Sequence, residues 1–380
     1  MTDFEIVAGW IFGSVPVDWP TSVSRHPRQV LEDELRPLLI RSPSYVLFSG
    51  GRDSSAVLAC AVELARREGL PIPIPVTRVY PGRAASDEAQ WQRRVLSHLK
   101  LDGWIRIEVT DELDILGPTA REGLLRHGVV FPATAFPQAF VFRQLASSPV
   151  FTGEGGDEVF GAQRITPLTA LIRRRRPFSG ELAAATLDAL SWRARRYKRS
   201  LRSHAEDSSA AGRDWLRPHI RRRVAELRAA HAAESPLYWD AGVRALLRQR
   251  WLRIGLANLH AVAADSSVDL AHPLLAPKFV NAVAAWGGRW GPVGRTETML
   301  RLFDDVLPED VLRRTSKARF NSAAIGDHSL SFAREWDGQG IDADSVDPEA
   351  LRRRWLSDLP PPATMPLLQQ AWLAGRPASG

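Results

Sequence analysis

The sequence contains a single cysteine, Cys60, so it cannot form an intramolecular disulfide and offers no cysteine-built metal site. No apolar run approaches the roughly 20 residues that a membrane span needs. The order of acidic and apolar residues at the N-terminus is not that of a signal peptide. We therefore expect a cytoplasmic protein. Cys60 lies on the apolar face of a predicted helix, where we expect a small buried thiol.

Acidic residues are too few to balance the arginines, and the net charge is +7. The excess is concentrated in helical, alanine-rich sequence at 173–176, 193–202 and 217–228. Such segments form either a solvated basic face or a docking face for an acidic peptide, a carrier or a nucleic acid. Aromatic residues do not alternate with these arginines, as they would in a surface that stacks bases. Nucleic acid is therefore not the partner that we expect.

With 44% hydrophobic and 24% charged residues, the chain has the composition of a globular protein. Between 45 and 152, short apolar runs alternate with helix-forming segments, which predicts an α/β fold with a parallel sheet and helices on both faces. The expected strands are 46–48, 74–80, 105–109 and 150–152, and the expected helices are 29–39, 56–67, 86–99 and 138–146. A further strand is expected at 4–12.

Beyond about residue 165 the strand signal vanishes, and long helical segments broken by proline and glycine follow. We therefore divide the chain into three parts. Residues 1–44 form a short N-terminal segment of strand, loop and helix, and residues 45–165 form a nucleotide-binding core. Residues 166–380 form a largely helical region that completes the active site and the substrate pocket.

The sequence Ser49-Gly50-Gly51-Arg52-Asp53-Ser54-Ser55 lies between a predicted strand and a predicted helix. In that arrangement, free N–H groups and the positive end of the helix dipole face an anion. Glycines allow close approach of a phosphate, serines add donors, and Asp53 can hold Mg²⁺. The spacing and the lysine of a Walker loop are both absent. The alternative is a tight turn in an unrelated α/β domain.

A second glycine turn, at residues 151–161, also follows a predicted strand and carries Glu154, Asp157 and Glu158. Because open α/β sheets bind ligands at the carboxyl ends of their strands, this turn and the first loop can face one crevice. Carboxylates so close together repel each other unless a cation lies between them. On its own, the stretch is equally typical of an acidic turn without a function.

In this order, the two turns resemble the synthetase domain of the asparagine synthetase family, which is of the ATP-pyrophosphatase type. This family includes β-lactam synthetases and the macrolactam cyclases of lasso peptides. The resemblance covers about residues 45–325. It rests on Ser49 to Ser54, Asp87-Glu88, Gly153 to Glu158, Pro273, Leu307-Pro308, Lys317 and Phe320.

The resemblance implies ATP and Mg²⁺ as cofactors, with Asp53 and Asp157 as metal ligands. Lys317 would reach the α-phosphate, and Glu154 either orients the attacking amine or is structural. Asp87 and Glu88 either favour the first turn of their helix or bind a ligand. The implied nucleotide-binding residues are Ser49, Gly50, Gly51, Asp53, Ser54, Ser55, Gly153 and Gly155. Lys317 is expected on a loop. If Arg313 and Arg314 beside it only face solvent, replacing either should cost far less turnover than replacing Lys317.

The sequence also departs from the family pattern. Glutamine-using members begin with a cysteine nucleophile, whereas position 2 is Thr2, so we expect no glutaminase activity. Ala271 and Ala276 stand where the family usually has an arginine and an aspartate, which argues against aspartate as the substrate. Between these two positions, His272 is expected to be a packed or capping histidine.

We therefore predict a ligase that adenylates a carboxylate, releases pyrophosphate, and couples the acyl group to an amine with release of AMP. A lactam or macrolactam formed within one natural product, as in lasso-peptide biosynthesis, fits best. The expected partners are a carboxylate and an amine, a precursor peptide, and a peptide-binding or protease protein. Alternatives are ammonia-dependent amidation of a small acid, an RNA-modifying ATP-pyrophosphatase, and a scaffold without activity.

Overall fold

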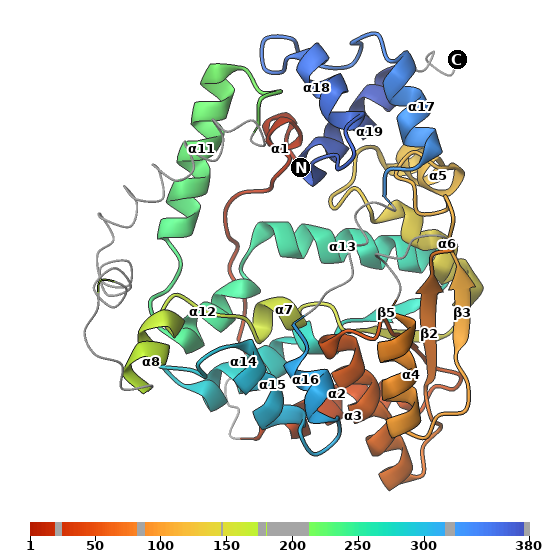
Figure 1. Ribbon diagram of the computed structural model, residues 1–380, viewed down its shortest axis with the longest axis vertical. Coiled ribbons are helices and arrows are strands. Elements are labelled where there is room, and N and C mark those ends of the chain that lie inside the picture. Colours follow the sequence, from red (N-terminus) through yellow and green to blue (C-terminus); the bar gives the residue numbers. More distant parts are fainter. Residues whose placement is uncertain are drawn as a thin grey trace.

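A computed structural model gives the fold. It describes residues 1–19, 25–81, 88–145, 147–173, 180, 213–315 and 324–375. Among these residues, five parallel strands form one sheet in the order β3-β2-β1-β4-β5. Their bounds are β1 Tyr45–Leu47, β2 Ile74–Val79, β3 Ile105–Glu108, β4 Pro149–Thr152 and β5 Asp269–Ala271. The predicted α/β fold is confirmed (Figure 1).

Helices make up most of the rest of the described chain. Those of the first half are α1 Asp3–Ala8, α2 Pro27–Leu39, α3 Arg52–Glu68, α4 Ala89–His98, α5 Pro118–His127, α6 Ala139–Phe142, α7 Gly156–Val159 and α8 Thr166–Arg173. Those of the second half are α11 Pro218–Ala233, α12 Trp239–Leu246, α13 Arg250–Asp265, α14 Pro277–Gly287, α15 Arg295–Phe303, α16 Glu309–Arg313, α17 Asp327–Glu335, α18 Pro348–Trp355 and α19 Met365–Ala374. Single 3-10 turns lie at Phe136–Gln138, Arg143–Leu145, Pro273–Leu275 and Pro362–Thr364.

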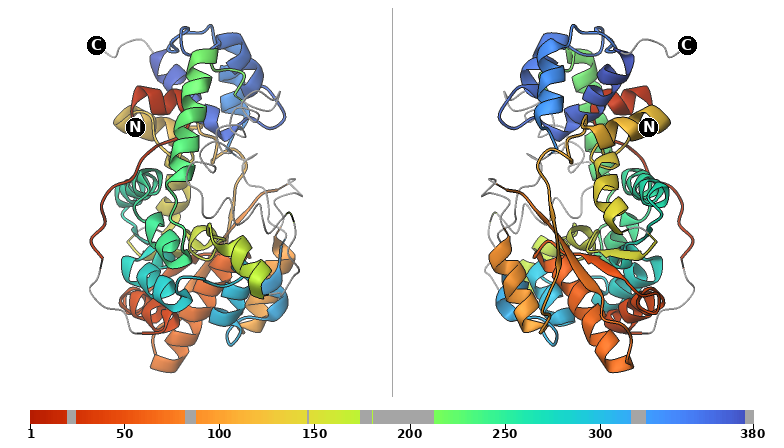
Figure 2. Two further views of the ribbon diagram at one scale, coloured as in Figure 1. Left: turned by 90° about the vertical axis from the view of Figure 1, so that its left-hand side faces the viewer. Right: turned by 90° about the vertical axis from the view of Figure 1, so that its right-hand side faces the viewer.

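Helices cover both faces of the sheet. On one face α2, α3, α14, α15 and α16 share a hydrophobic core with the inward side chains of β1 and β4. On the other face α5, α6 and α13 lie against the sheet, and the C-terminal helices α17, α18 and α19 pack beyond them (Figure 2). The sheet is therefore buried between two layers, as a parallel sheet requires.

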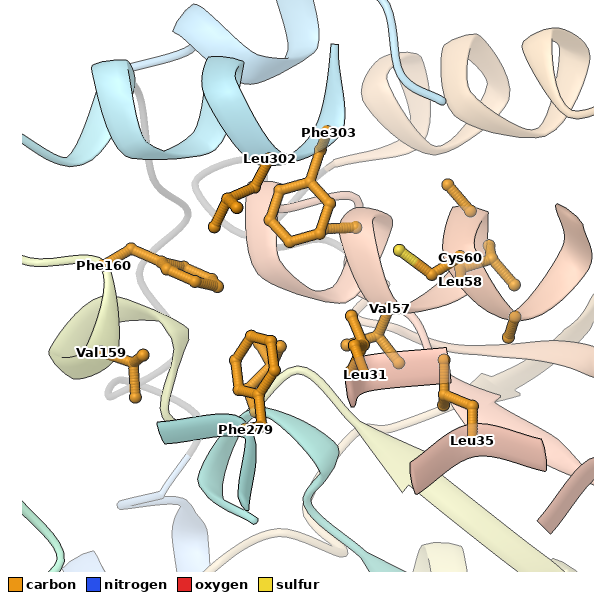
Figure 3. Packing of buried hydrophobic residues seen from close by; sticks show 14 of the residues in the cluster. Leu31, Leu35, Val57, Leu58, Cys60, Val159, Phe160, Phe279, Leu302 and Phe303 are labelled. Carbon is orange, nitrogen blue, oxygen red and sulfur yellow. The ribbon is translucent and has the colours of Figure 1, made fainter. Parts of the chain in front are cut away.

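Helix α3 shows why the first core forms. Its first residue follows Gly51 at the N-cap, and it ends at Gly69, whose φ of 68° is the left-handed cap that glycine adopts without strain. Residues 54–62 are all buried, and Val57, Leu58 and Cys60 belong to one hydrophobic cluster with Phe279 of α14 and Phe303 of α15 (Figure 3). Burial raises the pKa of the Cys60 thiol to about 12. Cys60 is therefore a packing residue, as predicted.

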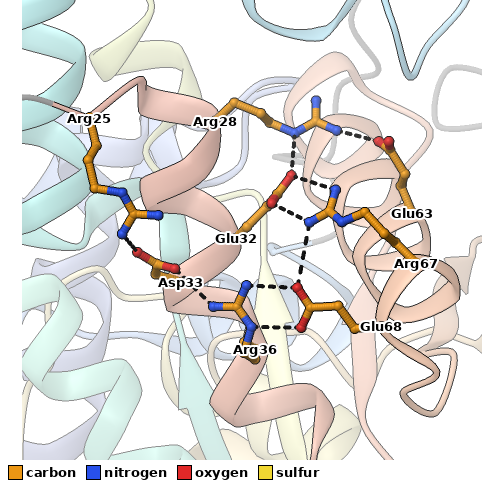
Figure 4. A network of polar contacts seen from close by, with 8 residues as sticks. All are labelled: Arg25, Arg28, Glu32, Asp33, Arg36, Glu63, Arg67 and Glu68. Carbon is orange, nitrogen blue, oxygen red and sulfur yellow. Dashed lines mark hydrogen bonds and ion pairs between the residues drawn. The ribbon is translucent and has the colours of Figure 1, made fainter.

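Charged side chains join α2 to α3 along their outer surface (Figure 4). Arg36 Nε donates to Glu68 Oε2 at 2.7 Å, and Arg28 Nη2 donates to Glu63 Oε2 at 2.6 Å. These pairs are partly exposed, so each contributes little to stability. Together they fix how α2 lies against α3.

The structure differs from the sequence predictions in three places. The strand expected at 4–12 is instead helix α1, which begins with a capping box: Thr2 Oγ1 accepts from the Glu5 N–H, and Glu5 Oε2 accepts from the Thr2 N–H. Strand β5 lies in the region where no strand was expected. The sequence does not predict it because three residues with one buried side chain give almost no periodicity. The helix expected at 138–146 is broken into α6 and two 3-10 turns.

The C-terminal helices are tied to the sheet by one buried carboxylate. Asp114, which follows β3 and is fully buried, accepts from the backbone N–H groups of Gly326 and Ser329 at 3.1 and 3.0 Å. It also accepts from the Ser329 hydroxyl and from the Leu116 N–H. Asp114 thus satisfies backbone donors at the start of α17.

No helix in the described part of the chain is long and apolar enough to cross a membrane.

We expect Asp114→Ala to lower the free energy of unfolding by at least about 3 kcal/mol, because it leaves several buried donors without an acceptor. Urea unfolding measures this loss. Asp327→Asn is the matched control, since Asp327 is exposed in the first turn of the same helix and its loss costs about 1 kcal/mol or less. Equal effects of the two changes would contradict the assignment of Asp114 as the anchor.

Candidate functional site

A cavity of about 470 Å³ lies beyond the carboxyl ends of β1 and β4. Strand β1 is flanked by β2 on one side and β4 on the other, so the chain changes direction across the sheet at this point. Open α/β sheets bind ligands at such a switch point. Leu47 is paired with Thr152, the last residue of β4, so the two predicted turns begin side by side.

The first turn is held by its own serines. Ser54 Oγ accepts from the Ser49 N–H at 3.2 Å and lies 3.1 Å from Ser49 Oγ, which accepts from the Gly51 N–H. Gly50 has a φ of 80°, and a Cβ there would lie 3.0 Å from Gln92 Cγ. All of these residues except Gly50 line the cavity, whereas Ser55 is fully buried and does not.

The second turn packs directly against the first. A Cβ at Gly153 would lie 2.5 Å from the Ser54 nitrogen, and a Cβ at Gly156 would lie 2.3 Å from Asp53 Cγ. Gly155 has a φ of 91° and faces Leu275. Glycine is required here because only a residue without a side chain lets two backbones approach this closely. The structure therefore brings the two motifs together, as the sequence predicted.

Asp53 and Asp157, the predicted metal ligands, lie on either side of Arg295. The Arg295 guanidinium donates to Asp53 Oδ2 through Nη2 and to Asp157 Oδ1 through Nη1. Burial raises the pKa of the Asp53 carboxyl, and Arg295 opposes that shift by stabilising the anion. Arg295 was not predicted, because no local pattern in 294–301 distinguishes it from a surface arginine.

The donors fit a hydrated magnesium ion better than a closed protein cage. Asp53 Oδ1 is buried and has no hydrogen-bond partner among the described residues, which leaves a carboxylate oxygen for a cation. Within the described ranges, no cluster of three or more histidine, cysteine, aspartate or glutamate side chains could hold a metal. Mg²⁺ is typically bound by one or two carboxylates together with waters and phosphate oxygens.

Glu154 and His272 lie on the β4 and β5 side of the cavity. The Glu154 N–H donates to Thr152 Oγ1 at 3.2 Å, and this hydroxyl lies 2.7 Å from His272 Nδ1. Either atom of this contact can donate, depending on the imidazole tautomer, and His272 Nε2 is buried without a hydrogen-bond partner among the described residues. Burial, with a smaller contribution from His260, lowers the pKa of His272 to about 3. His272 is therefore a neutral, packed histidine.

Arg314 is buried, so the condition that it only faces solvent is not met. Its side chain is 5% exposed, and that of its partner Glu88 is 7% exposed. Arg314 Nη2 donates to Glu88 Oε1 at 2.6 Å, and Nη1 donates to the Gly50 carbonyl at 3.1 Å. The guanidinium also lies 4.7 Å from the centre of the Trp91 ring. Arg313, in contrast, is exposed and pairs with Glu309.

Arg314 therefore positions the first turn, and Glu88 serves as its counter-ion. The sequence pattern could not distinguish Arg314 from Arg313, because the two are adjacent at the end of α16 and only the packing decides which one points inward. Lys317, Phe320 and Asp87 lie outside the described residues. Thr315, two residues before Lys317, lines the cavity.

Apolar side chains from segments other than the glycine turns also line the cavity. Among them are Pro132, Phe142, Leu259 and Leu270. On the β2 side, Arg78 Nη1 donates to Gln138 Oε1 at 3.0 Å, and both side chains line the cavity. The site thus combines an anion-binding turn, two carboxylates and apolar lining side chains.

A family model described as asparagine synthase matches residues 28–364. The chain belongs to this family, which confirms the membership inferred from the two turns. Membership indicates an ATP-dependent carbon–nitrogen ligase. No curated protein matches the chain.

We expect the neutral His272 to make the fold sensitive to acid. Its pKa is about 3 in the folded protein and near its usual 6.5 in the unfolded chain. As the pH falls below 6.5, the unfolded chain gains a proton that the folded protein does not. Stability is therefore lost between pH 6.5 and the folded pKa, by up to about 1.4 kcal/mol per pH unit.

The measurement is urea unfolding of wild type and His272→Asn from pH 7 to about 4.5. The variant should show a shallower loss of stability below pH 6.5 than wild type. His219→Asn, at an exposed position in the first turn of α11, should follow the wild-type slope. If His272→Asn also follows it, the assignment of a buried neutral imidazole is wrong.

We expect Arg314→Met to cost roughly 3–5 kcal/mol of stability, because it leaves the Glu88 carboxylate buried without its counter-ion. Arg313→Met should change stability by about 0.5 kcal/mol or less, as exposed substitutions do. Denaturant unfolding of the two variants compares neighbouring arginines directly. A double variant in which Glu88→Gln accompanies Arg314→Met should recover part of the loss; no recovery would contradict the pairing.

Proposed function

We propose that the protein adenylates a carboxylate with ATP·Mg²⁺ and transfers the acyl group to an amine. The observation that supports this best is the contact between the two glycine turns, which places Asp53 and Asp157 on one cavity with the start of α3. A cavity with one anion-binding turn alone would bind a phosphate but would have no second carboxylate for the cation that balances it.

ATP would lie with its phosphates on Ser49, Gly50, Gly51 and Ser54, where N–H groups and hydroxyls converge at the helix N-terminus. Asp53 and Asp157 would hold Mg²⁺, which supplies neutralisation of the charge on the phosphate chain. Gly153 and Gly155 would allow the second turn to approach the nucleotide closely. Ser55 is fully buried behind the turn. It would support the turn and would not contact the nucleotide.

In the first step, an oxygen of the substrate carboxylate attacks the α-phosphorus, and pyrophosphate leaves. In the second step, the amine attacks the acyl carbon, loses a proton, and AMP leaves as the amide forms. Lys317 would stabilise the negative charge that grows on the α-phosphate. Glu154, on the cavity wall, would orient the amine or take its proton.

The amine would come with a substrate. The lone thiol of the chain, Cys60, is fully buried and its pKa is raised to about 12, so it offers no nucleophile for glutamine. The apolar side chains that line the cavity favour an acyl group larger than aspartate. We therefore favour formation of a lactam or macrolactam on a precursor peptide, with a peptide-binding or protease partner, over amidation with free ammonia.

We expect the purified protein to catalyse exchange of labelled pyrophosphate into ATP when a suitable carboxylate is supplied, and to form AMP rather than ADP. A panel of amino acids, dicarboxylic acids and acidic peptides, each with and without an added amine, defines the acyl donor. Formation of ADP would show attack at the γ-phosphate and would contradict the proposal.

A matched pair of variants tests the role of Lys317 in the same assay. Lys317→Met should lower turnover by about a hundredfold or more, because one charged contact made in the transition state is lost. ATP affinity should change little. Arg313→Met removes a cation from the same segment, but this residue is exposed and should leave turnover nearly intact. Near-normal turnover in Lys317→Met would remove Lys317 from the mechanism.

A further inference from the structure

Arg295 occupies the space between the two carboxylates that would bind Mg²⁺. It is the first residue of α15, and its side chain is 21% exposed. Asp53 and Asp157 come from the two turns, 242 and 138 residues away in sequence. A guanidinium is planar and carries several donors in a fixed fork, so it can donate to two carboxylates at once. In the nucleotide-free protein Arg295 therefore supplies the positive charge that two adjacent carboxylates require.

The ion pair leaves two buried polar atoms without a partner. Asp53 Oδ1 and Arg295 Nε are both inaccessible to water and form no hydrogen bond with the described residues. A purely structural buried ion pair is stable when its remaining donors and acceptors are satisfied. Here one acceptor and one donor are left over, and both belong to residues that line the cavity. The vacant acceptor suits a cation, and the vacant donor suits a phosphate oxygen.

A second arginine, Arg52, adds another positive charge at this site. With both arginines present, a metal ion binds unfavourably unless an anion binds with it. Arg52, the first residue of α3, lines the same cavity as Arg295. Arg52 is held in place by Thr296 Oγ1 at 3.1 Å, so it cannot move away freely. A divalent cation added beside Arg295 and Arg52 would raise the local positive charge further. The triphosphate of ATP would remove that excess.

We propose that Arg295 and Mg²⁺ compete for Asp53 and Asp157, and that Arg295 passes to the phosphate chain when ATP·Mg²⁺ binds. This inference rests on the proposed function for the identity of the anion. Arg295 thus keeps the site closed to metal alone and couples metal binding to nucleotide binding. It is a positioning residue for the two carboxylates in the free protein and a binding residue for phosphate in the complex.

The competition predicts that removal of Arg295 has opposite effects on the two ligands. Arg295→Met should bind Mn²⁺ alone about tenfold or more tightly than wild type, a coupling of the size usual between two ligands of one site. The same variant should bind α,β-methylene-ATP with Mg²⁺ about tenfold or more weakly. A role confined to stability would lower the unfolding midpoint and move neither affinity in this way.

Mn²⁺ binding is measured by electron paramagnetic resonance of the free ion, and nucleotide binding by calorimetry. Arg301→Met is the matched control: Arg301 lies on the same helix, is 54% exposed and pairs with Glu297. It should match wild type in both assays. Arg295→Lys provides a second variant if Arg295→Met does not fold; an ammonium lacks the planar fork that fits both carboxylates, so it should hold them less well and Mn²⁺ affinity should still rise several-fold.

Unchanged Mn²⁺ affinity in both Arg295 variants would overturn the competition. Tighter Mn²⁺ binding with unchanged nucleotide affinity would overturn the transfer of Arg295 to phosphate. If wild type binds no ATP analogue at all, the proposed function fails, but the Mn²⁺ measurement still decides whether Arg295 blocks the two carboxylates. In Asp53→Asn/Arg295→Met, the gain in Mn²⁺ affinity should disappear; its persistence would place the metal elsewhere and contradict the proposal.

Discussion

The backbone pairing of β1 with β4 brings together the turns that carry Asp53 and Asp157. The register that joins Leu47 to Thr152 starts both glycine turns at the same level of the sheet. Because Gly153 and Gly156 carry no side chains, the second turn can lie against Ser54 and Asp53. Two acidic turns in such close contact would repel each other. The site is therefore stable only with a cation between the carboxylates, and in this structure the Arg295 guanidinium is that cation.

Two further sets of contacts support the glycine turns. Arg314 and Glu88 are both nearly fully buried and satisfy each other behind the first turn, where Arg314 also fixes the Gly50 carbonyl. On the other side, Thr152 and His272 order the backbone at Glu154 through neutral hydrogen bonds. The turns are thus supported by one buried ion pair and one neutral network. This arrangement keeps the positions of the donors fixed, as catalysis by electrostatic stabilisation requires.

The sequence predicted the parts of the fold that depend on local chemistry. The four strands up to residue 152 were found, because buried parallel strands are continuous apolar runs between turn residues. The two glycine turns were predicted from the residues that directly follow two of these strands. The family, which the family model confirms, was inferred from the order of the two turns. The failures have physical causes as well. A capping box at Thr2 and Glu5 gave a helix where hydrophobicity alone predicted a strand, and β5 is too short to show a period.

The sequence by itself determined the strand–turn–helix chemistry at Ser49 to Ser54 and the acidic turn after Thr152, since each is specified by neighbouring residues. Only the tertiary structure decided which distant groups complete them. Arg295 lies 242 residues from Asp53, and Arg314 lies 226 residues from Glu88. Arginines are frequent in this chain, and one that is buried against a carboxylate has the same neighbours in sequence as one that faces water. The burial that makes these two arginines important arises from packing between distant segments, which no local pattern records.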